Sequence, residues 1–148
     1  MSSASDVPAR LRAVVGKLSR RLDATARGSG LTSSQLSALG VVARSGPLRL
    51  SELADIEHMN PTMLSRIVGA LVDEGLLRRK PDPDDRRAGL VEVTALGRRT
   101  HDRLRAERGK ALADGLAAMA EPDRALVESA LPALEALVEA MRRDGGTR

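Results

Sequence analysis

The stretch NPTMLSRIVGALVDEG, residues 60–75, decides the fold of this chain. Asn60 is a favoured helix N-cap, Pro61 suits the first helical position and Gly75 is a typical helix stop. The spacing between them predicts a helix over 61–74 with two distinct faces. The apolar face carries Leu64, Ile67, Val68 and Leu71, and the other face carries Thr62, Ser65, Arg66, Gly69 and Asp73.

The second face suits the major groove of double-stranded DNA. Its small side chains let the backbone approach the base edges, and the guanidinium of Arg66 has the geometry to bind O6 and N7 of guanine. A helix that meets only water is more often rich in Glu and Lys, although a solvated helix remains the alternative. The composition therefore predicts a DNA-reading helix.

A hairpin is predicted directly after this helix. Residues 76–80 and 90–93 have the pattern of strands, and the connector between them, residues 81–89, is rich in Pro and Asp. Arg86 and Arg87 lie at its tip, where a thin ribbon can place a guanidinium in the minor groove. We expect an ion pair between Asp85 and Arg87 to hold the tip in shape. The alternative is a charged, solvated turn.

Before residue 60 the sequence predicts two shorter helices. Thr32 and Gln35 have capping-box spacing at the start of a helix that ends at residues 45–47. Residues 48–50 are long enough only for a turn or a small edge strand, and Ser51 is the expected N-cap of the next helix. The order over residues 32–93 is helix, turn, helix, helix, strand, charged loop, strand. This order is a winged helix-turn-helix in a mostly α (α+β) chain.

Long helices flank this region. Apolar residues recur at helical spacing over 7–22, Thr94 caps a predicted helix over 94–119, and Pro122 opens a last helix that contains Pro132. The last helix carries apolar residues at alternating steps of three and four, which is the pattern of a helix-pairing seam. Its members are Val127, Ala130, Leu131, Leu134, Leu137, Val138 and Met141.

Composition excludes several classes of function. The chain has 148 residues, no cysteine, no aromatic residue and a net charge of +4. It therefore lacks disulfides, a thiolate nucleophile and base-stacking platforms for single strands. No catalytic or nucleotide-binding motif is present, so we expect neither an enzyme nor a cofactor. His58 and His101 lie on separate predicted helices, and no metal site is expected. The N-terminus lacks the pattern of a signal peptide, which favours a cytoplasmic location.

Several segments together resemble the MarR family of bacterial transcriptional regulators. They are residues 51–54, 60–68, 71–77, 82–87 and 91–97. The wing signature of the family falls on Asp85, Arg87, Val91, Val93, Thr94 and Gly97. Length and helix order are similar over about the whole chain, residues 1–148, with a DNA-binding lobe over 32–97.

The resemblance implies a homodimeric repressor that binds a palindromic operator and is released by a small-molecule effector. Ser65 and Arg66 would contact bases, Asp85 would orient Arg87 in the minor groove, and the helix N-termini at Thr32 and Ser51 would contact phosphates. The residues predicted to contact DNA are Thr32, Ser33, Ser51, Asn60, Pro61, Thr62, Ser65, Arg66, Asp85, Arg86 and Arg87.

The resemblance also implies that helices over 7–27 and 120–143 interlock in the dimer. The residues predicted at that interface are Val7, Leu11, Val14, Leu18, Val127, Leu131, Leu134, Leu137, Val138 and Met141. The lack of aromatic residues argues against a stacking pocket for the effector. A winged helix that binds a protein partner, without sequence-specific DNA binding, is the alternative function.

Overall fold

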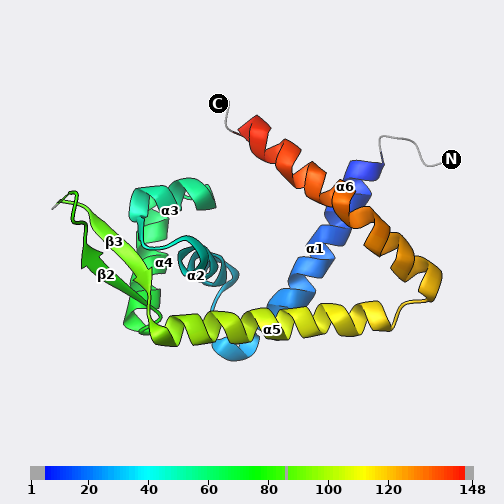
Figure 1. The fold of residues 1–148 in the computed structure, drawn as a ribbon, viewed down its shortest axis with the longest axis horizontal. Coiled ribbons are helices and arrows are strands. Elements are labelled where there is room, and N and C mark those ends of the chain that lie inside the picture. The colour runs from blue at the N-terminus through cyan, green and yellow to red at the C-terminus, as the bar shows by residue number, and fades with distance from the viewer. Residues whose placement is uncertain (1–5, 86, 146–148) are drawn as a thin grey trace. The chain divides into compact units, whose positions relative to one another are not determined.

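The computed structural model describes residues 6–85 and 87–145. In chain order its elements are α1 (Val7–Thr25), the short 3-10 helix η1 (Arg27–Ser29), α2 (Ser33–Ser45), β1 (Leu48–Arg49), α3 (Leu50–Glu57), α4 (Pro61–Asp73), β2 (Leu77–Pro81), β3 (Gly89–Val93), α5 (Ala95–Ala117) and α6 (Glu121–Gly145) (Figure 1). The chain divides into two compact units, and the division falls within α5, between Gly109 and Lys110. The predicted fold class, mostly helical with a small antiparallel sheet, is confirmed.

The first unit contains a helix-turn-helix packed on a small sheet. Helices α2, α3 and α4 contact one another, and α4 also contacts β2. Their shared core is entirely aliphatic, as the absence of aromatic residues requires. Its largest fully buried side chains are Leu39, Leu53, Leu64, Leu71, Leu77, Val42, Val68 and Val91. The predicted apolar face of α4 therefore lies in the core, where each buried side chain of this size stabilises the fold by about 1.5–3 kcal/mol.

Local hydrogen bonds fix both ends of α4. The side-chain oxygen of Asn60 accepts from the backbone N–H of Thr62 at 2.8 Å. At the other end Gly75 adopts a left-handed conformation (φ 74°), which glycine adopts without a steric penalty. The N–H of Leu76 donates to the carbonyl of Leu71, and that of Gly75 donates to the carbonyl of Val72. This pair of bonds is a Schellman motif, which ends the helix and turns the chain into β2.

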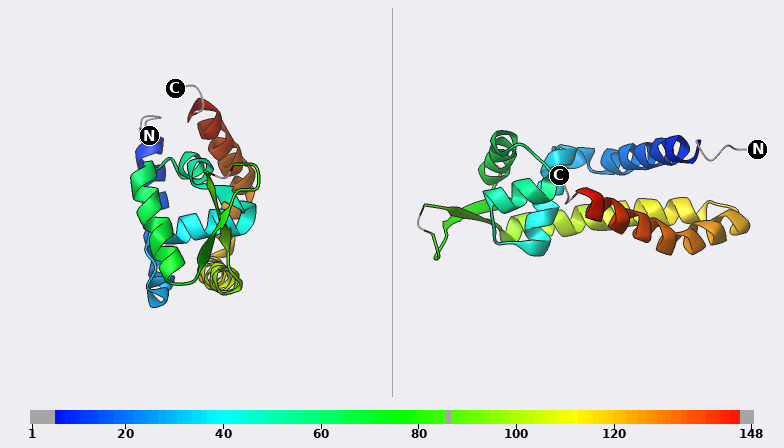
Figure 2. Two further views of the ribbon diagram at one scale, coloured as in Figure 1. Left: turned by 90° about the vertical axis from the view of Figure 1, so that its left-hand side faces the viewer. Right: turned by 90° about the horizontal axis from the view of Figure 1, so that it is seen from above.

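The sheet has the strand order β1-β3-β2, and both pairs are antiparallel. Strands β2 and β3 pair from Leu77 opposite Val93 to Pro81 opposite Gly89. Together they extend as a two-stranded ribbon beyond the helices of the first unit (Figure 2). This ribbon is the predicted wing, and β1 is the small edge strand allowed by residues 48–50.

One predicted helix start is wrong. Helix α3 begins at Leu50, and its N-cap is Arg49 rather than Ser51. The backbone N–H of Arg49 donates to a carboxylate oxygen of Glu52 at 2.7 Å, so the glutamate satisfies the helix start without a hydroxyl cap. Ser51 is an exposed residue of the first turn. The other boundaries agree with the prediction to within two residues.

The remaining predicted caps are confirmed. Thr32 and Gln35 form both bonds of the capping box at the start of α2. The hydroxyl of Thr94 accepts from the N–H of Gly97 at 3.0 Å at the start of α5. Pro132 lies inside α6. Among the described residues, no helix is both long and apolar enough to cross a lipid bilayer.

Candidate nucleic-acid interface

The outer face of α4 is open to solvent, as the sequence predicts. Thr62, Ser65, Arg66 and Asp73 are exposed, and Gly69 is half-buried. The guanidinium of Arg66 has no hydrogen bond or ion pair with any described residue. Helix α4 also contacts β2, so α4 and the wing lie next to each other at one end of the first unit (Figure 1). The arrangement leaves Arg66 free to meet an external acceptor.

The base of the wing is held by an ion pair that the sequence analysis missed. A carboxylate oxygen of Asp82 lies 2.6 Å from Nε of Arg49, and the side chain of Asp82 is only 4% exposed. Its second oxygen accepts from the backbone N–H of Asp84 at 2.9 Å. The Asp84 N–H, followed by the Arg49 guanidinium, lowers the pKa of Asp82 below its ordinary value. Asp82 therefore stays ionised and ties the wing loop to the residue that starts α3.

The contact between Asp85 and Arg87 differs from the predicted one. A carboxylate oxygen of Asp85 accepts from the backbone N–H of Arg87 at 3.0 Å. No ion pair joins this carboxylate to the Arg87 guanidinium in the described part of the chain. A backbone bond fixes the path of the loop and leaves the guanidinium available. Arg86, the other predicted residue of the tip, lies outside the described residues.

The basic residues of the wing fall into two groups. On one face, Glu92 pairs with Arg78 at 2.5 Å and with Lys80 at 3.1 Å. These two cations, Lys80 first, lower the pKa of Glu92. Arg79 lies on the opposite face of β2, because successive residues of a strand alternate. It is exposed and has no partner among residues 6–85 and 87–145.

Among the described residues of this end, three arginines are therefore exposed with their guanidinium groups unpaired: Arg66, Arg79 and Arg87. Arg49, Arg78 and Lys80 are neutralised by carboxylates. Arg79 was missed by the sequence analysis. The alternation of side chains along β2 could have placed Arg79 on the other face from Arg78 and Lys80. Only the ion pairs of Arg78 and Lys80 with Glu92 show that Arg79 is the free one.

The other predicted contact residues are also accessible. Thr32, Ser33, Asn60 and Pro61 are exposed. The hydroxyl of Ser33 donates to Asp23 of α1 at 2.9 Å, so it is partly committed to an internal contact. Among the described residues, no group of three or more His, Asp or Glu side chains is placed to hold a metal ion.

The predicted interface helices carry exposed apolar side chains in each unit. On α1 of the first unit, Val7, Val14 and Leu18 are about half exposed and Leu11 is half-buried. On α6 of the second unit, the exposed fractions run from 38% at Val127 to 67% at Met141. The large exposed side chains of the α6 seam are those of Val127, Leu131, Leu134, Leu137, Val138 and Met141.

The exposed helix face, the wing and the packing of α2, α3 and α4 define a winged helix-turn-helix, the fold of a large class of DNA-binding proteins.

Comparison with the sequences of known proteins leads to the same class of protein. The sequence model of the MarR family matches residues 31–88. An HTH-type transcriptional regulator of Mycobacterium bovis is 34% identical over 129 residues, which cover 87% of this chain and 90% of the relative. The chain belongs to the MarR family of HTH-type transcriptional regulators.

Solved structures show the same fold. RV1404 from Mycobacterium tuberculosis is 26% identical, with a TM-score of 0.79 and coverage of 95% of each chain. A MarR family protein from Bacillus stearothermophilus is 19% identical, with a TM-score of 0.79 over 91% of this chain and 94% of the other. The similarity extends beyond residues 31–88, because these alignments include nearly all of both chains.

Proposed function

We propose that this protein is a cytoplasmic homodimeric repressor that binds a palindromic operator in double-stranded DNA. The observation that carries the proposal is the set of unpaired, exposed arginines, Arg66 on α4 and Arg79 and Arg87 on the wing. A carboxylate-rich loop would be expected to neutralise them, yet Asp82 bonds to Arg49 and to a backbone N–H, and Asp85 bonds to a backbone N–H. Cations kept free in this way suit phosphates and base edges.

Each element has a distinct role in the proposal. Ser65 and Arg66 contact bases in the major groove, and Asn60, Pro61 and Thr62 place the start of α4 against the DNA backbone. Thr32, Ser33 and Ser51 lie near the starts of α2 and α3, whose free N–H groups meet phosphates. Arg87 enters the minor groove, with Asp85 holding its backbone. Arg79 binds a phosphate beside the wing.

The dimer in this proposal forms through α1 and α6. A contiguous apolar stripe exposed to water is typical of a protein interface. Two copies of the winged lobe would then read half-sites about 10–10.5 bp apart, or a multiple of that spacing. Membership of the MarR family supports the proposed repression and its proposed relief by a small-molecule effector.

Arg66→Ala is expected to weaken operator binding by roughly 1–3 kcal/mol and to relax the preference at one base position, because a base-specific pair is lost. The measurement is duplex affinity for the operator and for single-base variants of it. Arg103→Ala is the matched control, since Arg103 pairs with Glu107 on α5. An equal loss on every sequence would mean that Arg66 touches only phosphate.

Arg87→Ala is expected to weaken operator binding about tenfold without changing the melting temperature, because the guanidinium makes no hydrogen bond or ion pair within the described chain. The control is Arg78→Ala, which removes an exposed arginine already paired with Glu92. Wild-type affinity in the Arg87 variant would refute the minor-groove assignment.

The salt dependence of binding separates this proposal from a winged helix that contacts only proteins. Neutralising phosphates releases counterions, so affinity for duplex DNA should fall steeply as salt rises. A protein-interaction module would show no such slope, and that result would overturn the proposed function.

A further inference from the structure

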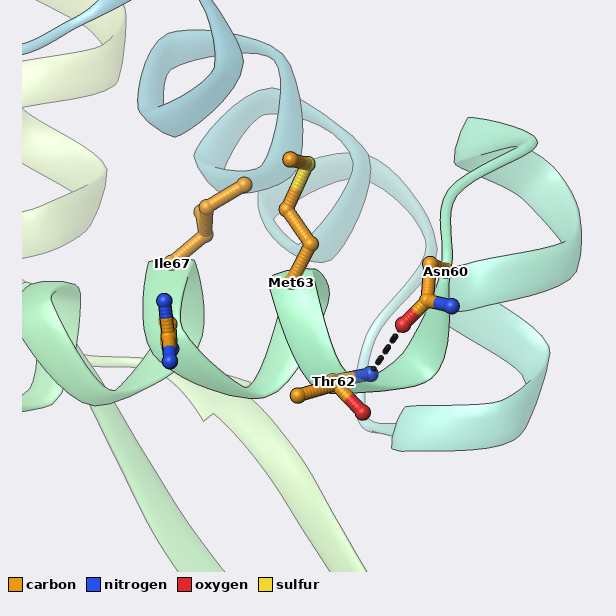
Figure 3. Close-up of a pocket in the computed structure, with 5 residues that line it drawn as sticks. Asn60, Thr62, Met63 and Ile67 are labelled. Atoms are coloured by element: carbon orange, nitrogen blue, oxygen red, sulfur yellow. Dashed lines mark hydrogen bonds between the residues drawn. The ribbon is translucent and has the colours of Figure 1, made fainter.

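A large apolar side chain interrupts the polar face of α4. Met63 is 58% exposed, although it lies in the first turn of a helix whose other outward residues are small or charged. It borders a hollow of about 400 Å³ lined by Asn60, Thr62, Met63, Arg66 and Ile67. Figure 3 shows Met63 and Ile67 side by side along the helix, with Thr62 beyond them beside Asn60.

The lining indicates what the hollow receives. No acidic side chain borders it, and its one charge is the unpaired guanidinium of Arg66. The rim is therefore compatible with a polyanion, while Met63 and the half-buried Ile67 supply an apolar wall. The hollow is also continuous with the face of α4 proposed to read bases. The group that binds in the hollow is therefore expected to be an apolar group that nucleic acid carries beside the polar edges of its bases.

We infer that Met63 and Ile67 form a slot for the 5-methyl group of thymine, and that Met63 is a specificity-determining residue. The thymine methyl is the apolar group that the major groove displays. Methionine suits the contact because its flexible, polarizable side chain adapts to an irregular surface. The inference rests on the proposed operator binding and adds a second recognised base to it.

The spacing on the helix sets where that thymine lies. Met63 and Arg66 are three residues apart, about one turn, which is roughly 5 Å along the helix axis. Successive base pairs are about 3.4 Å apart. The thymine read by Met63 is therefore expected one or two base pairs from the guanine read by Arg66.

Replacing thymine by deoxyuridine tests the inference, because it removes only the methyl group. The operator is first selected from a pool of random duplexes with the purified full-length protein, and each thymine is then replaced in turn. Burying one methyl is worth about 0.8 kcal/mol, so one substitution in a single half-site should weaken wild-type binding about fourfold. Met63→Ala should bind the thymine and deoxyuridine duplexes equally.

Two further variants isolate the contact. Met119→Ala removes an exposed methionine of the other unit and should keep the fourfold difference. Met63→Leu keeps an apolar side chain, so it should keep most of the fourfold difference between the two duplexes. Melting temperatures of the variants establish that each is folded.

The outcomes distinguish this inference from the proposed function. Sequence-specific binding that ignores every deoxyuridine substitution overturns the methyl slot and leaves the operator proposal standing. The slot is also overturned if Met63→Ala still binds the thymine duplex more tightly than the deoxyuridine duplex. It is likewise overturned if Met63→Ala changes the oligomeric state and leaves the base preference unchanged. A protein that enriches no sequence from the pool overturns both.

Discussion

Gly97→Ala is expected to destabilise the protein by about 3 kcal/mol, the upper end of the usual cost of overpacking, because the added methyl group has no room. A Cβ atom at Gly97 would lie 1.9 Å from the backbone oxygen of Leu76 and 2.9 Å from a methyl of Val93. The oxygen belongs to the backbone and accepts a bond from the N–H of Thr94, so it cannot move aside freely. The melting temperature, followed by circular dichroism, should fall by roughly 10 °C.

Gly109→Ala on the same helix is the control. A Cβ there meets nothing within 4 Å. Since alanine favours a helix over glycine, this variant should be more stable than the wild type by up to about 1 kcal/mol. Equal melting temperatures for Gly97→Ala and the wild type would contradict the close approach of α5 to the start of β2.

Leu137→Asp is expected to abolish the dimer and to weaken operator binding about 100-fold or more. Leu137 lies in the middle of the exposed seam on α6. A carboxylate buried at that place would cost several kcal/mol unless it were paired. Loss of the second winged lobe removes the effective concentration that linkage provides, which commonly contributes a factor of 10² or more. Sedimentation or light scattering gives the mass, and titration of the operator gives the affinity.

Ala136→Asp places the same charge on the opposite side of α6, where the residue is exposed. This control should remain dimeric and bind normally. Should Leu137→Asp lose its fold rather than its partner, Leu134→Asp measured at several protein concentrations gives a second test. A folded dimer of both seam variants would show that the seam is not the interface.

The local features of the fold were predictable because they depend on neighbouring residues. Asn60, Pro61 and Gly75 set the ends of α4, and Thr32 and Gln35 set the start of α2, through bonds that span two to five residues. The start of α3 was predicted wrongly at Ser51, and the reason is also local. Glu52 reaches back to the N–H of Arg49, and that bond begins α3 earlier than a hydroxyl cap would.

The candidate site was only partly predictable. The outward face of α4 followed from helical spacing, and Arg87 from its place at a turn. The pairing of the charged residues could not be predicted from the sequence, because Arg49 and residues 77–93 together contain six cations and four carboxylates, which allow many pairings. Asp85 was expected to hold the Arg87 guanidinium, but it binds the backbone N–H instead. Arg79 was not recognised as free.

By itself, then, the sequence determined the order of helices and strands, the faces of α4 and the position of the wing, since hydrophobic spacing and capping act within a few residues. Only the tertiary structure decided that Arg49 and Asp82, 33 residues apart, form the ion pair at the base of the wing. It also decided that Gly97 has no room for a side chain against Leu76. Both contacts depend on how the strands and helices pack, and packing brings together residues that no local pattern relates.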